Sequence, residues 1–374
     1  MARHDPTSPI TTTFDMNQTD SVNSARTLIL RYGRNSTAYQ IINPGFLRWF
    51  APDEMGLVGY VSRGKTIVAA GEPVSPIENS LEVATRFESN TLSGGIKRLC
   101  WFCASSEFVS HFRNRTGYAT VVIGAQPVWN PKTWREKIEG HPSLRAQLHR
   151  ARNKGVEVEE WPKEKALNHP ELQQCLNEWL DNRPFPPLHF LVEPQTLDRL
   201  FDRRVFVAKW NQNVVGFVLL SPVPLRNGWL VEQFVRRRAA PNGTVELLLD
   251  QAITTIARED YTYVTLGLAP LSRRADIAVT NPPLIRFLFG WLRLHGRRFY
   301  KFDGLDFFKA KFSPDYWEPI WGVVNESRFS LRTLYAIAAA FSNGSPIRSV
   351  LLALFKALRQ EGRWLALRLQ SRGD

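Results

Sequence analysis

The stretch that decides the fold runs from Trp229 to Ser272, WLVEQFVRRRAAPNGTVELLLDQAITTIAREDYTYVTLGLAPLS. It begins with an apolar, β-branched segment, Trp229 to Val235, which predicts a buried strand. In the turn that follows, Asn242-Gly243 frees the backbone for a tight reversal, and Thr244 can cap a helix predicted over Val245 to Arg258. A second strand and a polar loop complete the stretch, so its order is strand, turn, helix, strand.

The turn between the first strand and the helix predicts an anion-binding site. Arg236, Arg237 and Arg238 lie just before the helix, whose unpaired N–H groups and dipole point toward the same turn. The arrangement resembles that of the N-acyltransferase fold of the acetyltransferase superfamily, which holds a phosphorylated acyl donor in this way.

Composition indicates a globular protein with an unusual charge. At 374 residues the chain can bury one large core or two ordinary ones, and 44% hydrophobic residues suffice for either. The formal net charge of +13 predicts attraction to polyanions, meaning nucleic acid, an anionic membrane surface or both. A generally basic, solvated surface is the alternative, and charge alone does not separate the two.

The cysteines and the N-terminal residues favour a reducing compartment. The three cysteines are an odd number, and residues 1–20 lack the apolar region of a secretory signal. Cys100 and Cys103 have CxxC spacing, but no second pair or His cluster lies nearby, so buried structural cysteines are favoured over a zinc site. No apolar run reaches the ~20 residues that a membrane-spanning helix needs.

Alternating strand and helix patterns divide the chain into successive units. Residues 1–25 read as a disordered tail. We expect 26–130 and 131–325 to form two units, each a mixed sheet flanked by helices, with a boundary near 127–131. Residues 326–374 are expected to form a helical, basic amphipathic extension. Strands are predicted over 56–62, 66–70, 98–103, 118–124, 156–161, 204–210, 214–220 and 229–235, and helices over 78–92, 105–115, 142–154, 170–182, 245–258 and 282–295.

Within the extension, residues 350–369 carry an apolar stripe at helical spacing, with most basic residues off the stripe. Such a helix either lies in a lipid interface or packs on the core with its cations facing water, and the sequence supports both equally.

An ordered set of motifs carries a family resemblance. The chief landmarks are Glu232 to Arg236, Ala240 to Thr244, Leu266 to Ser272 and Gly304 to Phe312, and weaker ones are Gly71 to Val74 and Leu144 to Asn153. Together they resemble the catalytic region of the lysyl- and alanyl-phosphatidylglycerol synthases, the multiple peptide resistance factor family. The resemblance covers roughly residues 27 to 325. It implies tandem acetyltransferase-like (GNAT-like) domains of α+β class, the second of them catalytic, in a stand-alone form without the transmembrane flippase part.

The resemblance also implies a reaction. A hydroxyl of phosphatidylglycerol attacks the aminoacyl ester of a charged tRNA, so the implied partners are aminoacyl-tRNA, as co-substrate, and an anionic phospholipid membrane surface. Because the ester is already activated, no metal and no further cofactor is expected. The implied location is the cytoplasm, peripherally on the inner face of the cell membrane.

The resemblance points to Glu232, Arg236, Lys309 and Lys311 as catalytic residues. The family tends to have an acid where this sequence has Gln233. Because neighbouring strand residues face opposite sides, either Glu232 reaches the cleft through a β-bulge or Gln233 takes the place of the acid without its charge. Arg236 is expected to bind a phosphate or the carbonyl oxygen.

Lys309 and Lys311 would point the same way if their segment is extended, and two ammonium groups on one face suit a phosphodiester of the tRNA end or of a lipid head group. The basic, aromatic region 286–311 suits nucleic-acid contact, although core packing is the more common role for each aromatic residue singly. Asp303 is expected either as an acid of the cleft or as a local salt partner. Residues expected to bind substrate are Arg145, Arg150, Arg152, Asn153, Gln233, Asn242, Gly243, Thr244, Ser272 and Asp303.

Two other functions compete with this one. An acyl-coenzyme A N-acyltransferase would use a glycine-rich phosphate loop, whereas this turn lacks those glycines and Pro241 removes an N–H donor. A non-catalytic tRNA- or membrane-binding relative would account for Gln233 in place of the acid.

Overall fold

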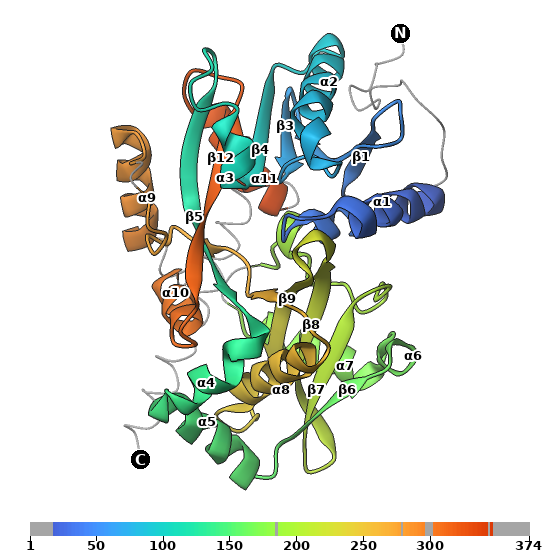
Figure 1. The fold of residues 1–374 in the computed structure, drawn as a ribbon, viewed down its shortest axis with the longest axis vertical. Coiled ribbons are helices and arrows are strands. Elements are labelled where there is room, and N and C mark those ends of the chain that lie inside the picture. Colours follow the sequence, from blue (N-terminus) through green and yellow to red (C-terminus); the bar gives the residue numbers. More distant parts are fainter. Residues whose placement is uncertain (1–17, 184–185, 278–279, 296–301, 343–344, 347–374) are drawn as a thin grey trace, which may run out of the picture.

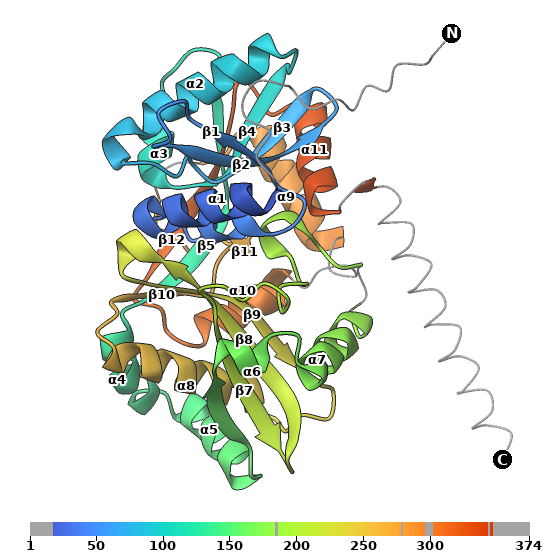
Figure 2. The same ribbon diagram turned by 90° about the vertical axis from the view of Figure 1, so that its right-hand side faces the viewer.

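The structure is a computed structural model that describes residues 18–183, 186–277, 280–295, 302–342 and 345–346 (Figure 1). Its described strands form a 12-stranded sheet in the order β1-β2-β3-β4-β12-β5-β10-β9-β8-β7-β6, with the short β11 (Ala269–Pro270) paired to β5. Helices cover both faces of this sheet (Figures 1 and 2). The expected α+β class, with a mixed sheet flanked by helices, is therefore confirmed.

The N-terminal half contains the first hairpin. Its strands are β1 (Leu47–Phe50), β2 (Leu57–Arg63), β3 (Thr66–Ala70), β4 (Arg98–Ala104) and β12 (Tyr316–Val324). Its helices are α1 (Gln18–Tyr32), η1 (Ala38–Ile42), η2 (Ile77–Asn79), α2 (Ser80–Ser93), α3 (Ser106–Ser110), α9 (Pro283–His295) and α11 (Leu331–Phe341). β2 and β3 pair antiparallel with Arg63 opposite Thr66, which confirms the predicted hairpin.

In the C-terminal half, both faces of the sheet are packed against hydrophobic cores. Its strands are β6 (Glu157–Trp161), β7 (Arg204–Trp210), β8 (Asn213–Val223), β9 (Gly228–Arg236) and β10 (Tyr263–Thr265). Its helices are η3 (Pro131–Thr133), α4 (Trp134–Glu139), α5 (Pro142–Asn153), α6 (Lys163–Ala166), α7 (Pro170–Asp181), η4 (Phe190–Val192), η5 (Pro224–Arg226), α8 (Thr244–Arg258) and α10 (Phe302–Ala310). Alternate residues of β7 enter different cores, Phe206 and Ala208 on one face and Val205 and Val207 on the other, as the pleat requires.

The strand β5 (Ala119–Trp129) joins the two halves. It pairs with β12 along its whole length, from Ala119 opposite Val324 to Val128 opposite Tyr316, and its last residues also pair with β10. β5 therefore continues through the boundary that was expected near residues 127–131.

The N-terminal tail prediction was wrong from residue 18 onward. α1 begins at Gln18, and Ala25 and Ile29 on one of its faces are completely buried. Figure 2 shows α1 lying where the two halves meet. The polar composition of this segment hid a narrow apolar stripe, which suffices to anchor a helix.

The chain returns to the N-terminal half near its end. β12 lies between β4 and β5, and α11 packs on β2 and β3, so residues 316–341 do not follow the expected division at 325. The amphipathic helix predicted over 350–369 lies outside the described residues. In the part of the chain that is described, no helix combines the length and the apolarity needed to cross a bilayer.

Candidate functional site

The sheet opens between β9 and β10. These strands are parallel neighbours from Gly228, opposite Tyr263, to Leu230, opposite Thr265, and then they diverge. β9 continues along β8 to Arg236, whereas residues 266–268 lead to β11, which pairs with β5 on the same edge as β10. Diverging strands leave main-chain groups without ladder partners, so the opening is a natural place for other elements or ligands to bind.

A β-bulge lies on β9 just after this opening. Leu219 of β8 pairs with Gln233 and Leu220 pairs with Val231, so Glu232 is the extra residue. The bulge is one of the two alternatives that the sequence left open for Glu232, and it changes where Glu232 and Gln233 point.

The bulge directs Glu232 into the contact between the two halves. Its carboxylate accepts a hydrogen bond from Arg203 Nε at 2.6 Å and another from Gln40 of η1. Arg203 in turn donates to Asn43 Oδ1 at 2.7 Å and lies over the ring of Tyr39. A buried charge needs such partners, so Glu232 stabilises the polar contact between the two halves.

The amide nitrogen of Gln233 is engaged in a different place, while its amide oxygen is buried without a hydrogen-bond partner. Its amide Nε2 donates to the carbonyls of Glu193 and Pro194 at 2.9 and 3.1 Å and to the hydroxyl of Thr196 at 3.2 Å. Only 8% of the residue is exposed. The amide therefore holds the loop 193–196, a task that needs a donor which a carboxylate lacks.

In the turn after β9, the side chains of Arg236, at the strand end, and Arg238 have no polar partner among the described residues. Arg236 is exposed, and within the described chain its guanidinium has no hydrogen-bond or ion-pair partner. Arg237 instead donates to Gln174 of α7 at 2.8 Å, and the main-chain N–H of Arg238 is held by Glu178.

The tight reversal at Asn242-Gly243 is confirmed, but the capping role of Thr244 was wrong. Gly243 has φ +95°, and a Cβ there would lie 2.2 Å from the carbonyl oxygen of Gln147 on α5. Thr244 is the first helical residue, and its hydroxyl donates to Pro241 O at 2.7 Å. Asn242 is exposed beside them. The glycine thus lets α5 pack against the start of α8.

Lys309 and Lys311 lie at the end of the helix α10, so the extended segment in which both would point the same way is not formed. Lys309 is 2% exposed, and its Nζ donates to the carbonyls of Leu266, Gly267 and Leu268 at 2.7 to 2.8 Å. Burial lowers the pKa of Lys309 to about 7, against the opposing charge of Asp306. Three acceptors match the three N–H bonds of an ammonium group, so Lys309 fixes the chain just after β10.

Lys311 and the aromatic residues of α10 attach the same helix to neighbouring elements. Lys311 pairs with Glu246 in the first turn of α8 and donates to Gln147 at 3.3 Å. The ring of Phe308 stacks on Phe234 of β9 at 5.3 Å between centroids. The end of α10 thus covers the opening between β9 and β10.

The basic helix α5 packs against α8 in the C-terminal half, and β5 rather than α5 joins the halves (Figure 1). Arg152 pairs with Asp250 of α8 at 2.8 Å. Arg150 and Asn153 are exposed, and Arg145 is half-buried. These four side chains therefore offer a basic outer surface rather than an interdomain cleft.

A cavity of about 380 Å³ lies beside Ser272. It is lined by Val122, Leu271, Ser272, Arg273, Ala275, Ile277, Thr280, Asn281, Arg286, Phe289 and Arg293. Ser272 is buried, and its hydroxyl accepts from the N–H of Arg274 at 3.3 Å. Arg273 and Arg286 are exposed and lack polar side-chain partners among the described residues. Three arginines beside apolar side chains suit an anionic ligand with an apolar portion.

Asp303 is tied to this cavity through one of its arginines. It accepts from Arg293 Nε at 2.6 Å, which matches the salt-partner alternative and links α9 to α10. Asn281 closes the wall by pairing with the main-chain N–H and carbonyl of Val122, both at 2.7 Å. The sequence reasoning missed Arg273 and Asn281 as cavity residues, because each lies in an irregular loop where no periodicity reports on burial.

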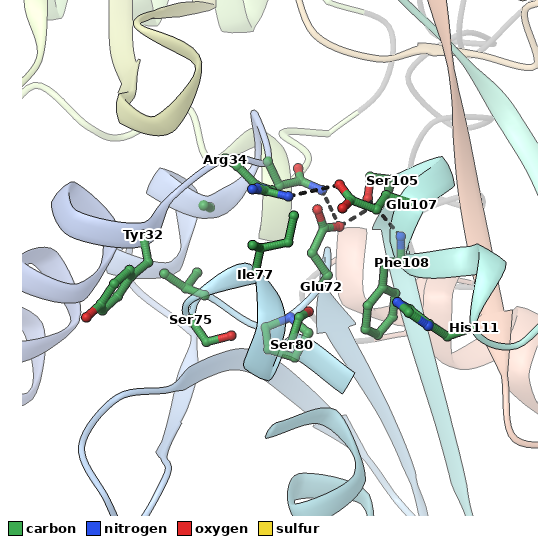
Figure 3. Close-up of a pocket in the computed structure, with 14 residues that line it drawn as sticks. Tyr32, Arg34, Glu72, Ser75, Ile77, Ser80, Ser105, Glu107, Phe108 and His111 are labelled. Atoms are coloured by element: carbon green, nitrogen blue, oxygen red, sulfur yellow. Dashed lines mark hydrogen bonds and ion pairs between the residues drawn. The ribbon is translucent and has the colours of Figure 1, made fainter. Parts of the chain in front are cut away.

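A second, smaller pocket lies at Glu72, in one of the weaker motifs (Figure 3). Glu72 Oε2 accepts from Asn35 Nδ2 at 2.7 Å and from the N–H of Ser105 at 3.0 Å, while Oε1 is buried without a hydrogen bond. Burial raises the pKa of Glu72. At about 50 Å³, the pocket has room for water but not for a lipid head group.

Within the described ranges, no group of three or more His, Cys, Asp or Glu side chains is placed to hold a metal ion. The three cysteines are buried and unpaired, as expected for structural cysteines.

Known proteins resemble this chain over most of its length. An uncharacterized protein of Corynebacterium glutamicum is 23% identical over 339 residues, which are 87% of this chain but 41% of that relative. The chain thus spans less than half of the curated relative it matches.

Two solved structures share the fold. One is the C-terminal domain of a putative lysylphosphatidylglycerol synthetase from Agrobacterium fabrum, with a TM-score of 0.75 and 22% identity, covering 88% of this chain and 98% of that one. The other is L-PGS from Bacillus licheniformis, with a TM-score of 0.69 and 19% identity, covering 90% and 96%.

A family model agrees with these neighbours. The model described as phosphatidylglycerol lysyltransferase, C-terminal, matches residues 26–324, which hold both halves of the sheet and the cavity beside Ser272. The chain therefore belongs to the phosphatidylglycerol lysyltransferase C-terminal family, as its ordered motifs suggested.

Proposed function

We propose that this protein is an aminoacyltransferase that moves an aminoacyl group from a charged tRNA to a hydroxyl of phosphatidylglycerol at the inner face of the cell membrane. The observation that carries the proposal is the arginine-lined cavity beside Ser272 in a chain of this family. An arginine binds a phosphate oxygen pair through parallel N–H bonds, which suits the phosphodiester of such a lipid.

The reaction is a direct exchange of esters. The lipid hydroxyl oxygen bonds to the carbonyl carbon of the aminoacyl ester, the bond from that carbon to the tRNA ribose oxygen breaks, and the hydroxyl proton ends on the ribose oxygen. The ester is already activated, so the protein has to orient two substrates and stabilise the oxyanion.

Arg236 is the residue we assign to the donor. It is the cation without a polar partner at the end of β9, beside the opening between β9 and β10. Because this guanidinium has no ion pair or hydrogen bond to break, it can bind the tRNA phosphate or the developing oxyanion at little cost in free energy.

Arg273 and Arg286 are assigned to the lipid phosphate, with the buried hydroxyl of Ser272 as a nearby donor. Glu232, Gln233 and Lys309 are assigned to positioning, because Glu232 already binds Arg203 and Gln40, the Gln233 amide N–H groups bind the loop 193–196, and Lys309 binds the chain after β10. The exposed basic residues Arg145, Arg150 and Asn153 remain candidates for contact with the tRNA backbone.

The proposal is tested by lipid analysis of cells that express the wild-type chain, Arg236→Ala or Arg238→Ala. Arg238 is the matched control, because it is an exposed arginine of the same turn. We expect a new ninhydrin-positive phospholipid with the wild type and Arg238→Ala only, and its mass identifies both the amino acid and the acceptor. In the purified reaction, ribonuclease should abolish the product. Folded protein that forms no lipid product from a mixture of charged tRNAs would refute the assignment.

A further inference from the structure

We propose that the exposed face of α9 is the surface by which this protein lies on an anionic lipid bilayer, next to the arginine-lined cavity. The choice of a lipid partner rests on the proposed function. The location of the surface rests on α9 itself.

α9 presents large apolar side chains to solvent along one face. Leu284, Phe287 and Leu294 are 63%, 73% and 61% exposed, and Trp291 is 51% exposed. Their spacing of three, four and three residues places all four on one side of the helix. Contiguous exposed apolar surface of this kind marks an interaction site in a soluble protein.

The opposite face of α9 is already packed. Ile285 is 4% exposed and belongs to the core of the N-terminal half, and Phe289 packs against that core. The apolar face toward solvent is therefore additional to the face that anchors the helix.

The charges on α9 favour an anionic lipid interface as the partner. Its sequence, PLIRFLFGWLRLH, contains Arg286 and Arg293 and no acidic residue. Both arginines line the cavity, together with Arg273 from the preceding loop. Leu, Phe and Trp on one face with flanking arginines is the composition of helices that lie in the plane of a lipid interface, where head groups neutralise the arginines.

α10 extends the same surface. It is linked to α9 by the pair of Arg293 and Asp303, and it exposes Phe307, at 66%, next to the guanidinium of Arg274. Figure 1 shows α9 and α10 on one side of the molecule. With 13 residues, α9 is too short to cross a bilayer, so the helix would lie along it.

Binding to vesicles tests the surface without tRNA and without turnover, so the result is independent of whether transfer occurs. Flotation with vesicles of phosphatidylglycerol and phosphatidylethanolamine is compared for the wild type, the double variant Phe287→Ser with Leu294→Ser, and Leu331→Ser. Leu331 on α11 is 82% exposed and is the matched control, since it is an exposed apolar residue of a helix outside this surface. We expect about a tenfold or larger loss of vesicle partition for the double variant and none for Leu331→Ser. Arg286→Glu should weaken binding to anionic vesicles in a salt-dependent way.

A site-specific label identifies what covers α9. The three native cysteines are buried, so Phe287→Cys and Leu331→Cys can each be labelled selectively with an environment-sensitive dye. We expect the label at 287, and not the one at 331, to report an apolar environment only when anionic vesicles are added. An apolar environment at 287 without vesicles, lost when the chain is cut after Ser345, would assign the face to the chain's own C-terminal segment and overturn the proposal. Wild-type partition of the double variant would do the same.

Discussion

Arg203 and Glu232 form an ion pair at 2.6 Å in which the two side chains are only 0% and 6% exposed. The carboxylate comes from the bulge on β9, and the pair is completed by Gln40 and Asn43 around η1 of the other half. One β-bulge thus sets both the course of β9 beside the opening and the contact between the halves.

The first prediction concerns this pair. Glu232→Gln should destabilise the protein by about 3 to 5 kcal/mol, because it leaves the Arg203 guanidinium buried without a counter-charge. The double change Glu232→Leu with Arg203→Leu should recover much of that loss, since a buried pair replaced by apolar groups is close to neutral. Urea unfolding measures both.

The control for this prediction is Glu139→Gln, which breaks the exposed pair with Arg135 at 3.0 Å. It should change stability by less than about 1 kcal/mol. If Glu232→Gln and Glu139→Gln changed the free energy of unfolding equally, the pair of Arg203 and Glu232 would not be a buried contact in solution.

The second prediction concerns Lys309. Lys309→Ala or Lys309→Met should lower stability by about 2 kcal/mol or more, because the carbonyls of residues 266–268 lose their donor. From the sequence, Lys309→Ala is expected to abolish transfer without affecting the fold. The buried position predicts instead that activity falls together with stability.

Lys311→Met is the control for the lysine prediction, since its side chain is 30% exposed and pairs with Glu246 near the surface. Its melting temperature should drop less than that of Lys309→Met. A Lys309→Met protein with wild-type melting temperature and no transfer would return Lys309 to the catalytic residues.

The regular elements of the C-terminal half were predictable because their signals are local. The hydrophobic runs of β7, β8 and β9 and the spacing of α7 and α8 report directly on burial. The motif Leu266–Ser272 also led to the large cavity, since Ser272 lines it.

The partners of side chains were not predictable, because they depend on distant segments. Arg203, some 29 residues before Glu232, carried no motif, and the helix α10 was hidden because FDGLDFFKAKF fits both a strand and a helix pattern. From the sequence, Gln233 stands where the family tends to have an acid, whereas in the structure its amide binds the loop 193–196. Sequence spacing identifies candidate site residues, but it does not predict the direction in which a β-bulge points their side chains.

The third prediction concerns Arg236. Arg236→Ala should abolish or strongly reduce transfer while stability changes by less than about 0.5 kcal/mol, because the side chain is exposed and makes no polar contact in the described structure. Initial rates with charged tRNA and thermal melting are measured on the same preparation, with Arg238→Ala alongside. A wild-type rate for Arg236→Ala would remove this residue from the mechanism.

The last prediction uses the contact of α1 with the C-terminal half. Burial acts to raise the pKa of Asp202, but hydrogen bonds from Arg26 and Tyr39 outweigh it, so the pKa is lowered in the folded protein. A carboxyl group with a lowered folded pKa contributes stability above its unfolded pKa of about 3.9, and this contribution is lost as the pH falls through the folded value. Wild type should therefore lose stability more steeply than Asp202→Asn as the pH falls from about 5 to about 3 in urea titrations. Above pH 5, Asp202→Asn should be less stable than wild type, because a neutral amide cannot replace the carboxylate that accepts from both Arg26 and Tyr39. Parallel pH profiles for the two proteins would show that the contact between α1 and Asp202 contributes nothing in solution.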